Sequence, residues 1–138
     1  MYLFDTFEGF DEKDVMVDVK NEYSRSRDDF SNTSLSLVLS KMKYPENCII
    51  KKGYFPETAE GIDEQYVFVS IDVDLFQPIY NGLCYFYPRL KHGGYIFVYD
   101  YNYVPYSGTK EAVKKFSKEY GVSYFPLSDD SGSVVFIK

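Results

Sequence analysis

The chain has 138 residues, of which 45% are hydrophobic and 20% aromatic, and its formal net charge is −6. This length and apolar content fit one globular domain with a sizeable core and exclude a disordered chain. The negative charge argues against nucleic acid or an anionic membrane as the main partner, whereas it suits an enzyme that binds a cation locally.

The first half of the chain is predicted to alternate short strands with polar segments. The apolar run Met1–Phe4 predicts a strand that ends at Asp5. Residues 11–31 are polar and charged, which predicts a mobile, lid-like loop or a short helix with solvated charges. Ser31–Ser34 offers N-cap residues for a helix, and residues 48–52 form a second short strand. That helix carries an apolar face made of Leu35, Val38, Leu39 and Met42.

The next segment is a continuous apolar, β-branched and aromatic run over residues 66–72. Such a run predicts a strand buried on both faces, beneath two layers of helices. Pro78 fits the first turn of a following helix. The apolar stripe of that helix continues to Leu90, and we expect His92–Gly94 to turn the chain into a strand over 95–100.

The C-terminal part predicts one more helix and two strands. The helix begins at residues 107–109 and ends at Gly121, which suits a left-handed C-cap. Strands over 122–127 and 133–137 are joined by a short turn-rich link, which indicates an antiparallel hairpin. The whole pattern predicts an α/β protein with mostly parallel strands.

The two cysteines, Cys48 and Cys84, are isolated, with no second pair and no histidine positioned to complete a metal motif. We predict two reduced, half-buried thiols, as is typical of a cytoplasmic protein. No apolar stretch approaches the ~20 residues of a membrane-spanning helix. The segment Met1–Asp5 also lacks the basic region of a signal peptide. We therefore expect a cytoplasmic protein without a membrane partner.

Acidic residues stand at the ends of two predicted strands, namely Asp72 and Asp74 after one and Asp100 after the other. Ligands of parallel sheets bind beyond these ends, and carboxylates suit Mg²⁺ or a similar hard cation. Asp72 or Asp74 could instead cap the following helix. Three enzyme classes use such acids: haloacid-dehalogenase-like phosphatases, DxD metal-dependent glycosyltransferases and metal-assisted methyltransferases. Phe76 disfavours the first class, which has Thr or Val at that position.

Four stretches, in one order and spacing, resemble the macrocin O-methyltransferase (TylF-type) family. Its members are S-adenosylmethionine-dependent enzymes that methylate sugar hydroxyls. The resemblance covers essentially the whole chain; each stretch alone is moderately specific, whereas four in register are strong. The stretches are Phe4-Asp5-Thr6-Phe7-Glu8-Gly9-Phe10, Gly53-Tyr54-Phe55-Pro56-Glu57-Thr58, Ser70-Ile71-Asp72-Val73-Asp74-Leu75-Phe76-Gln77-Pro78 and Phe86-Tyr87-Pro88-Arg89-Leu90 with Gly93-Gly94-Tyr95-Ile96.

The resemblance implies a Rossmann-like class I methyltransferase sheet of strand order 3-2-1-4-5-7-6, mostly parallel with a C-terminal antiparallel hairpin. Met1–Phe4 then corresponds to strand 2 and residues 66–72 to strand 4. In that frame we expect residues 1–138 to form a single, truncated domain that lacks the first strand and its glycine-rich loop, because no Gly-x-Gly precedes Asp5.

The resemblance also implies a cofactor site for S-adenosylmethionine. Asp5 matches the acid that binds the ribose, since one carboxylate can accept hydrogen bonds from both ribose hydroxyls. Thr6 and Phe7 adjoin it in the same motif. Tyr54 and Phe55 fall near the expected position of the adenine. Asp72 is expected to contribute to the cofactor site as well as to the metal site.

For the metal, the resemblance implies Mg²⁺ held by Asp72 and Asp100. Asp74 could act as a compensating ligand, or the metal could bind weakly or not at all. The compensation is needed because Tyr99 replaces a family acid, and a phenol with a pKa near ~10 stays protonated at neutral pH. In the implied mechanism the metal holds neighbouring sugar hydroxyls and lowers the pKa of the attacking one. No general base is assignable, because the one histidine, His92, is expected in a surface turn.

The absent first strand leaves two apolar edges in the middle of the sheet, and such edges invite pairing with another chain. Strands 2 and 4 could pair directly, a second copy could fill the gap, or a separate polypeptide could supply the strand. We expect a homo-oligomer through these exposed edges.

The function expected first is that of a sugar O-methyltransferase fragment, inactive alone, with a sugar or glycoside as acceptor. The alternatives are a non-catalytic remnant that folds as an oligomer and a DxD glycosyltransferase.

Overall fold

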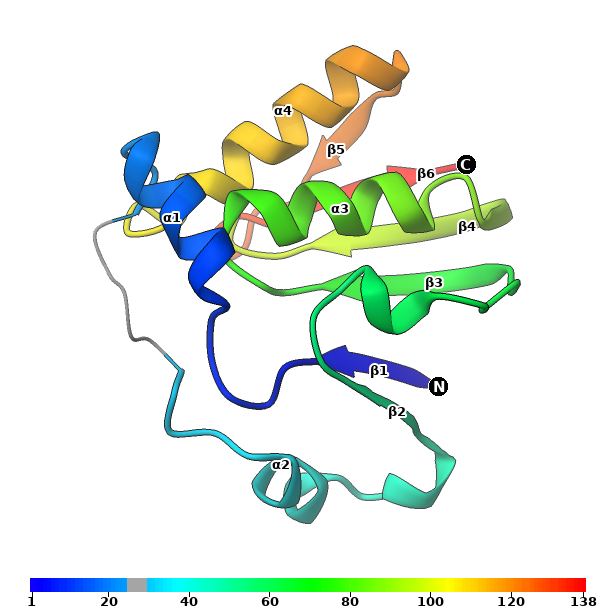
Figure 1. Ribbon diagram of the computed structural model, residues 1–138. Helices are drawn as coiled ribbons and strands as arrows, with labels where there is room; N and C mark the ends of the chain where they lie inside the picture. Colours follow the sequence, from blue (N-terminus) through cyan, green and yellow to red (C-terminus); the bar gives the residue numbers. More distant parts are fainter. Residues whose placement is uncertain (25–29) are drawn as a thin grey trace.

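The structure, a computed structural model, describes residues 1–24 and 30–138. It contains two separate sheets that lie next to each other, with all strands seen roughly edge to edge in Figure 1. The strands are β1 (Tyr2–Asp5), β2 (Ile49–Lys52), β3 (Tyr66–Ile71), β4 (Leu90–Val98), β5 (Tyr124–Pro126) and β6 (Val134–Ile137). The helices are α1 (Glu12–Lys20), α2 (Leu35–Lys41), α3 (Phe76–Phe86) and α4 (Gly108–Tyr120), with short 3₁₀ turns at Pro45–Asn47 and Glu57–Ala59.

The strand order confirms the arrangement that the family resemblance implied. The four-stranded sheet has the order β3-β4-β6-β5, and the small sheet pairs β1 with β2 in parallel. The pairing of β3 with β4 is parallel, whereas β6 runs antiparallel to both β4 and β5. Within the described residues β1 and β3 do not pair with each other. Of the three outcomes predicted for the open edges, direct pairing of β1 with β3 is therefore not observed among the described residues.

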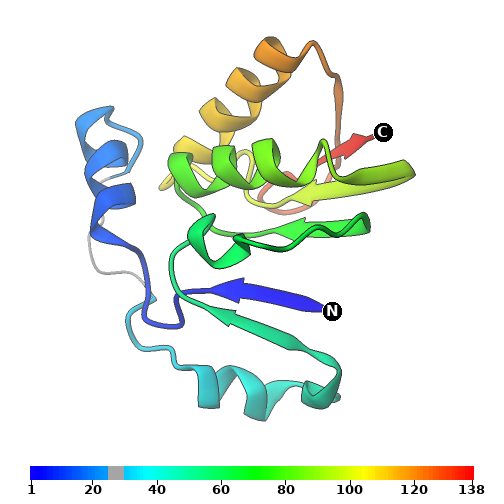
Figure 2. The same cartoon turned by 45° about the vertical axis from the view of Figure 1, so that its right-hand side comes forward.

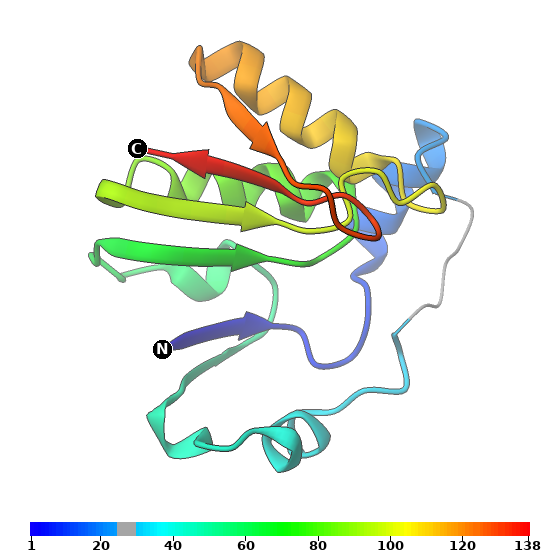
Figure 3. The same ribbon diagram turned by 180° about the vertical axis from the view of Figure 1, so that it is seen from behind.

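Among the described residues, helices cover one face of the four-stranded sheet and leave the other uncovered. α3 and α4 lie on the covered face, and the view from behind shows β3, β4 and β6 in front with no helix over them (Figure 3). On the uncovered face Phe68 is 50% exposed and contacts the rings of Tyr95 and Phe97. The prediction that strand 66–72 is buried on both faces was wrong. Aromatic side chains gave the run its unbroken apolar character, but half of them face outward.

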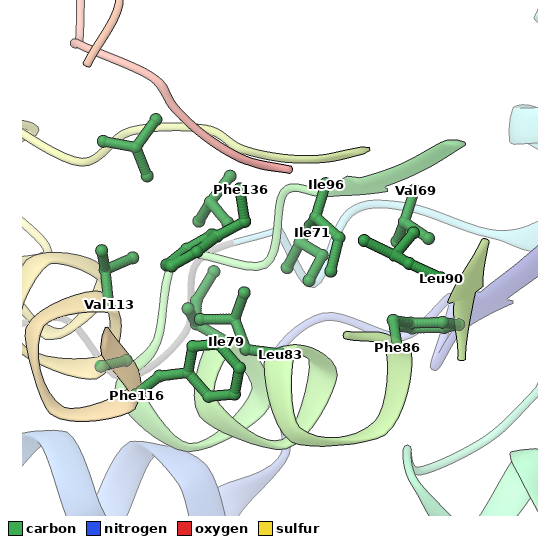
Figure 4. Close-up of a cluster of buried hydrophobic side chains, with 13 residues drawn as sticks. Val69, Ile71, Ile79, Leu83, Phe86, Leu90, Ile96, Val113, Phe116 and Phe136 are labelled. Atoms are coloured by element: carbon green, nitrogen blue, oxygen red, sulfur yellow. The ribbon is translucent and has the colours of Figure 1, made fainter. Parts of the chain in front are cut away.

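The core lies between the four-stranded sheet and the helices α3 and α4. Ile79 and Leu83 of α3 are fully buried against Ile96 and Val98 of β4, which alternate with more exposed residues along the strand. Phe116 of α4 packs edge-on against Phe136 of β6, with ring centroids 5.4 Å apart (Figure 4). Burying a side chain of this size contributes about 1.5–3 kcal/mol. These layers therefore fix the positions of the strand ends at which the site lies.

The boundaries of one predicted element were wrong. α3 ends at Phe86, and β4 already begins at Leu90. Tyr66 pairs with Leu90 but Phe68 pairs with Tyr95, so β4 bulges between these pairs. Consequently His92 lies within a strand and not in a turn, although its side chain is exposed as expected. The other helices, the C-cap Gly121 at φ 63° and the β5–β6 pairing follow the prediction.

The polar segment 11–31 contains α1, and Figure 2 shows this helix beyond the carboxyl ends of the strands. Residues 25–29 of the predicted lid lie outside the described residues. Cys48 and Cys84 are free, half-buried thiols, as predicted, and the cytoplasmic location stays a prediction. None of the helices in residues 1–24 and 30–138 is both long and apolar enough to cross a membrane.

Candidate functional site

A cavity of about 450 Å³ lies at the carboxyl ends of β1, β3 and β4. Parallel strands place their C-terminal residues at one edge of a sheet, and ligands of α/β proteins bind there. Aspartates dominate the polar lining, and four of them come from the ends of β1, β3 and β4 or the turns that follow, whereas two come from the segment of α1. The lining acids are Asp5, Asp11, Asp14, Asp72, Asp74 and Asp100. Such a lining attracts cations.

The loop after β1 is held by short local hydrogen bonds. Asp5 Oδ1 accepts the backbone N–H of Phe7 at 2.5 Å, and Thr6 Oγ1 donates to the carbonyl oxygen of Gly9 at 2.6 Å. Asp5 and Thr6 line the cavity, whereas Phe7 is 2% exposed and does not line it. The loop thus presents Asp5 and Thr6 to a ligand and uses Phe7 as an anchor with φ 57°.

Tyr54 and Phe55 form the wall beyond β2. The Tyr54 hydroxyl donates to Asp14 Oδ1 at 2.9 Å, and Lys13 Nζ lies 4.9 Å from the centroid of the Tyr54 ring. Phe55 stacks on Phe86 at 5.4 Å, so its ring also belongs to the core. Both aromatic residues line the cavity, and Phe55 also packs in the core.

Asp72 and Asp100 are brought together at the ends of β3 and β4. Burial, and then the negative charge of Asp100, raises the pKa of Asp72. Asp74 and Asp100 have φ values of 58° and 57°, the left-handed region that few residues other than glycine, asparagine and aspartate adopt. Strained backbone of this kind clusters at functional sites. The Asp74 carbonyl oxygen accepts a hydrogen bond from Thr109 Oγ1 at 2.8 Å, which ties this turn to α4.

These acids do not form a complete metal centre. In the part of the chain that the structure describes, no group of three His, Cys, Asp or Glu side chains is close enough to hold a metal ion. Tyr99, at the position of the replaced family acid, is absent from the lining of the cavity and instead contacts the ring of Phe97. The structure thus brings together two predicted ligands, Asp72 and Asp100, but not a third.

Two acids of α1 were missed, because the charges of residues 11–31 were predicted to be solvated. Asp14 is only 5% exposed and Asp18 is fully buried. Burial is the main cause that raises the pKa of each carboxyl to about 6. For Asp14 the hydrogen bond from Tyr54 acts in the opposite direction. The spacing was a usable signal, since Asp14 and Asp18 stand four residues apart, on the helix face that also carries Val15.

Asp18 lies where two helices begin. Its Oδ1 accepts the backbone N–H of Phe76, the first residue of α3, at 2.9 Å. A Cβ atom on Gly108, the first residue of α4, would lie 2.5 Å from Asp18 Oδ2. Helix N-termini carry unpaired N–H groups and partial positive charge, which favour a carboxylate. Asp18 therefore fixes α1 against the body of the protein beside the cavity.

Comparisons with known proteins bear on this geometry. The model of the macrocin O-methyltransferase (TylF) family matches residues 1–138. No curated relative matches the chain. Among solved structures, the O-methyltransferase NovP is similar with a TM-score of 0.75 at 18% identity, over 99% of this chain and 59% of NovP. The calicheamicin methyltransferase CalS11 has a TM-score of 0.72 at 16% identity, again over 99% of this chain and 59% of its own. The chain thus spans less than two thirds of the length of either protein.

Proposed function

The chain belongs to the macrocin O-methyltransferase (TylF) family, and from this membership we propose that its cavity serves S-adenosylmethionine-dependent O-methyl transfer. The acid-lined cavity at the carboxyl ends of β1, β3 and β4 is the observation that carries the proposal. A cofactor with a positively charged sulfonium suits a lining rich in aspartate and free of lysine and arginine among the described residues.

The chain's own residues would hold the adenosine part of the cofactor. Asp5 accepts one backbone N–H in the present loop, and a carboxylate retains further acceptor sites for ribose hydroxyls. Thr6 stands beside it, and Tyr54 and Phe55 offer ring faces and edges to the adenine. When bound, the cofactor supplies its methyl group as an electrophile for an attacking hydroxyl oxygen.

The acceptor is proposed to be a hydroxyl of a sugar or glycoside, as the family resemblance in the sequence implies. The attacking oxygen must be held in line with the methyl group, so positioning carries much of the rate. Asp72, Asp74 and Asp100 would accept hydrogen bonds from the acceptor's hydroxyls. Mg²⁺ assistance stays a separate prediction, and no step is assigned to the metal because the acids do not form a complete centre.

Residues 1–138 alone are expected to transfer methyl groups poorly or not at all. The groove between β1 and β3 is open beside the cavity, and Phe4, Asp5, Phe55 and Asp72 line both. Water entering through it would weaken the hydrogen bonds and charge interactions that hold a ligand. The alternative of a non-catalytic remnant predicts that no cofactor binds at all.

Calorimetric titration with S-adenosylmethionine, with and without Mg²⁺, tests the proposal. We expect saturable binding that Asp5→Ala abolishes while Asp63→Ala, an exposed acid outside the cavity, leaves it unchanged. Absence of heat in a folded sample would favour the remnant. Binding of a nucleotide sugar instead would support the glycosyltransferase.

Association between copies through the open edges of β1 and β3 is proposed as well. Unpaired strand edges offer rows of backbone donors and acceptors to another chain. Light scattering tests this, and a clean monomer at micromolar concentration would contradict it.

A further inference from the structure

One buried carboxylate of the cavity, that of Asp14, is not used by the methyl transfer proposed above. Asp14 stands in the first turn of α1 and lines the cavity, although the residue is only 5% exposed. Because α1 lies beyond the carboxyl ends of the strands (Figure 2), Asp14 reaches the cavity from a different element than the acids at the strand ends. Burying a charge is costly unless it is paired or hydrogen-bonded. The partners of Asp14 therefore indicate what it can bind.

The described residues satisfy this carboxylate only in part. The Tyr54 hydroxyl donates to Asp14 Oδ1 at 2.9 Å and is the one side chain among the described residues that does so. None of the ion pairs within that part of the chain includes Asp14. The ammonium group of Lys13 instead lies over the Tyr54 ring. A carboxylate has about four acceptor sites, so Asp14 can accept further hydrogen bonds from a ligand in the cavity.

The position of α1 does not depend on Asp14. Asp18, one turn further along the helix, accepts the backbone N–H of Phe76. Val15 packs against Leu75, the residue that precedes α3. These contacts attach α1 to the start of α3 without the Asp14 carboxylate. A ligand therefore accounts for this buried acid better than packing does.

The contact with Tyr54 places Asp14 at the adenine end of the proposed cofactor site. In that site the ribose is assigned to Asp5, and the adenine to the wall formed by Tyr54 and Phe55. The hydroxyl is the outermost atom of a tyrosine, so Asp14 lies beyond the Tyr54 ring. Adenine carries its exocyclic amino group on the edge away from the ribose. A base that lies along the Tyr54 ring therefore turns this amino group toward Asp14.

The lining around Asp14 suits a flat, apolar base with one polar edge. Apolar side chains contact the faces of such a ring, and a few polar groups fix its orientation. Burial raises the pKa of Asp14 to about 6, so at pH 8 the carboxyl is ionised and can only accept hydrogen bonds. The apolar side chains that line the same cavity include those of Phe10, Phe55, Val73, Leu75 and Pro78.

We propose that Asp14 accepts a hydrogen bond from the exocyclic amino group of adenine and thereby makes the cavity selective for an adenine nucleoside. This inference rests on the proposed function, because the position of the base follows from the assignment of Asp5, Tyr54 and Phe55 to the cofactor. A site with a buried hydrogen-bonding group rejects a ligand that lacks the matching group, because the buried group is then left unpaired. A purine without the amino group should accordingly bind less well.

Other partners fit Asp14 less well. The methionine end of the cofactor is joined to the 5′ carbon of the ribose and the adenine to the 1′ carbon, so the ammonium group and the base extend from Asp5 in different directions. The sulfonium has no N–H to donate. Asp11 also lines the cavity, but its Oδ1 accepts the backbone N–H of Lys13 and caps α1. Asp14 is thus the acid of α1 that remains for the base.

The test removes the amino group from the ligand and the carboxylate from the protein, separately and together. The ligands are S-adenosylhomocysteine and its analogue in which a hydrogen atom replaces the amino group of the base. Titration calorimetry at pH 8 measures both affinities for the original chain, for Asp14→Ala and for Asp14→Asn. Asp11→Asn is the matched control, because it also removes one negative charge from the cavity while asparagine retains the N-cap. Circular dichroism verifies that each variant folds.

We expect the original chain to bind the adenine ligand at least about tenfold more tightly than the analogue, as a hydrogen bond to a charged group implies. Asp14→Ala should bind the two ligands equally, because the two changes remove the same interaction. Asp14→Asn keeps an acceptor oxygen without the charge, so its ratio should lie between these values. Asp11→Asn should retain the original ratio, whatever it does to both affinities.

Two results would overturn the assignment of Asp14 and leave the proposed function standing. One is equal affinity of the original chain for the two ligands, which needs no variant. The other is an undiminished ratio in Asp14→Ala, which would assign the amino group to a different acceptor. If neither ligand binds the folded chain, the proposed function fails and this inference fails with it.

Discussion

Asp18 Oδ1 of α1 accepts the backbone N–H of Phe76 at 2.9 Å, and this bond caps α3 from a distant part of the chain. Leu75, at the N-cap position of α3, has an apolar side chain that cannot accept a hydrogen bond from the helix N–H groups. Asp18 Oδ2 is buried and has no hydrogen-bond partner among the described residues. One half of this carboxyl is thus satisfied and the other is not, and burial raises its pKa to about 6.

The free energy of unfolding should therefore fall as the pH rises from about 4 to about 6. Asp14 and Asp18 have pKa values of about 6 in the folded protein against 3.8 as the ordinary value. Between these pH values the folded state binds more protons than the unfolded state. The stabilisation that these two groups give to the folded state is therefore complete below pH 3.8 and is lost as the pH rises through 6. Each group contributes at most about 3 kcal/mol. Urea unfolding across this pH range checks the slope, and rising stability would contradict it.

Asp18→Asn should stabilise the protein at pH 7 by about 1–2 kcal/mol, because the amide oxygen can still accept the N–H of Phe76 while the buried charge is removed. Asp18→Ala should destabilise it by about 1–3 kcal/mol, because the N–H is left unpaired. Chemical denaturation of both variants provides the measurement. Equal effects of Asn and Ala would show that the hydrogen bond does not matter.

Gly108→Ala should destabilise the protein by about 2 kcal/mol or more, as overpacking does. The new Cβ atom would lie 2.5 Å from Asp18 Oδ2 and 2.8 Å from the backbone nitrogen of Phe76, and the latter cannot yield. Gly82→Ala is the matched control in α3. Its new Cβ atom would lie 3.0 Å from Cδ1 of Ile71, the end of a flexible side chain, and alanine has a higher helix propensity than glycine. Thermal unfolding should separate the two variants, and similar melting temperatures would refute the crowding at Gly108.

Tyr54→Phe should raise the pKa of Asp14 above its present value of about 6. The hydroxyl of Tyr54 stabilises the charged carboxylate, and its removal leaves burial and the charge of Asp11 to act with less opposition. Carbon-detected NMR titration of Asp14 makes the measurement.

Asp100→Asn is a companion experiment at the cavity, where loss of the negative charge should lower the pKa of Asp72. Asparagine tolerates the φ of 57° at this position, so the backbone should not change. An unchanged titration of Asp72 would show that the two carboxyls do not interact.

The family resemblance predicted the strand order correctly, whereas the acid-tipped apolar runs by themselves predicted only a mostly parallel sheet and the positions where its strands end. Asp5, Asp72 and Asp100 accordingly meet at one cavity. The pattern of apolar residues did not predict those features that depend on tertiary packing, namely side-chain exposure and the exact end of a helix. Phe68 is apolar yet half exposed, and the pattern of apolar residues through Tyr87 and Leu90 did not reveal that α3 ends at Phe86.

Charge misled the interpretation of α1 for a related reason. A run of acids and lysines is normally solvated. The four-residue spacing of Asp14 and Asp18 indicates that they share a helix face with Val15, but it does not show which acid another helix needs at its N-terminus. The partner of Asp18 is 58 residues away, at Phe76. Such a contact follows from the fold and cannot be read from the segment itself.

The division of the strands into two sheets has a consequence for how the molecule unfolds. β1 and β2 share backbone hydrogen bonds only with each other among the described strands, and side chains such as Phe4 and Phe55 attach them to α3. Contiguous units held in this way open cooperatively below the free energy of global unfolding. The amides of β1 and β2 should exchange with solvent early and as a group, while those of β4 and β6 should wait for the whole domain to open.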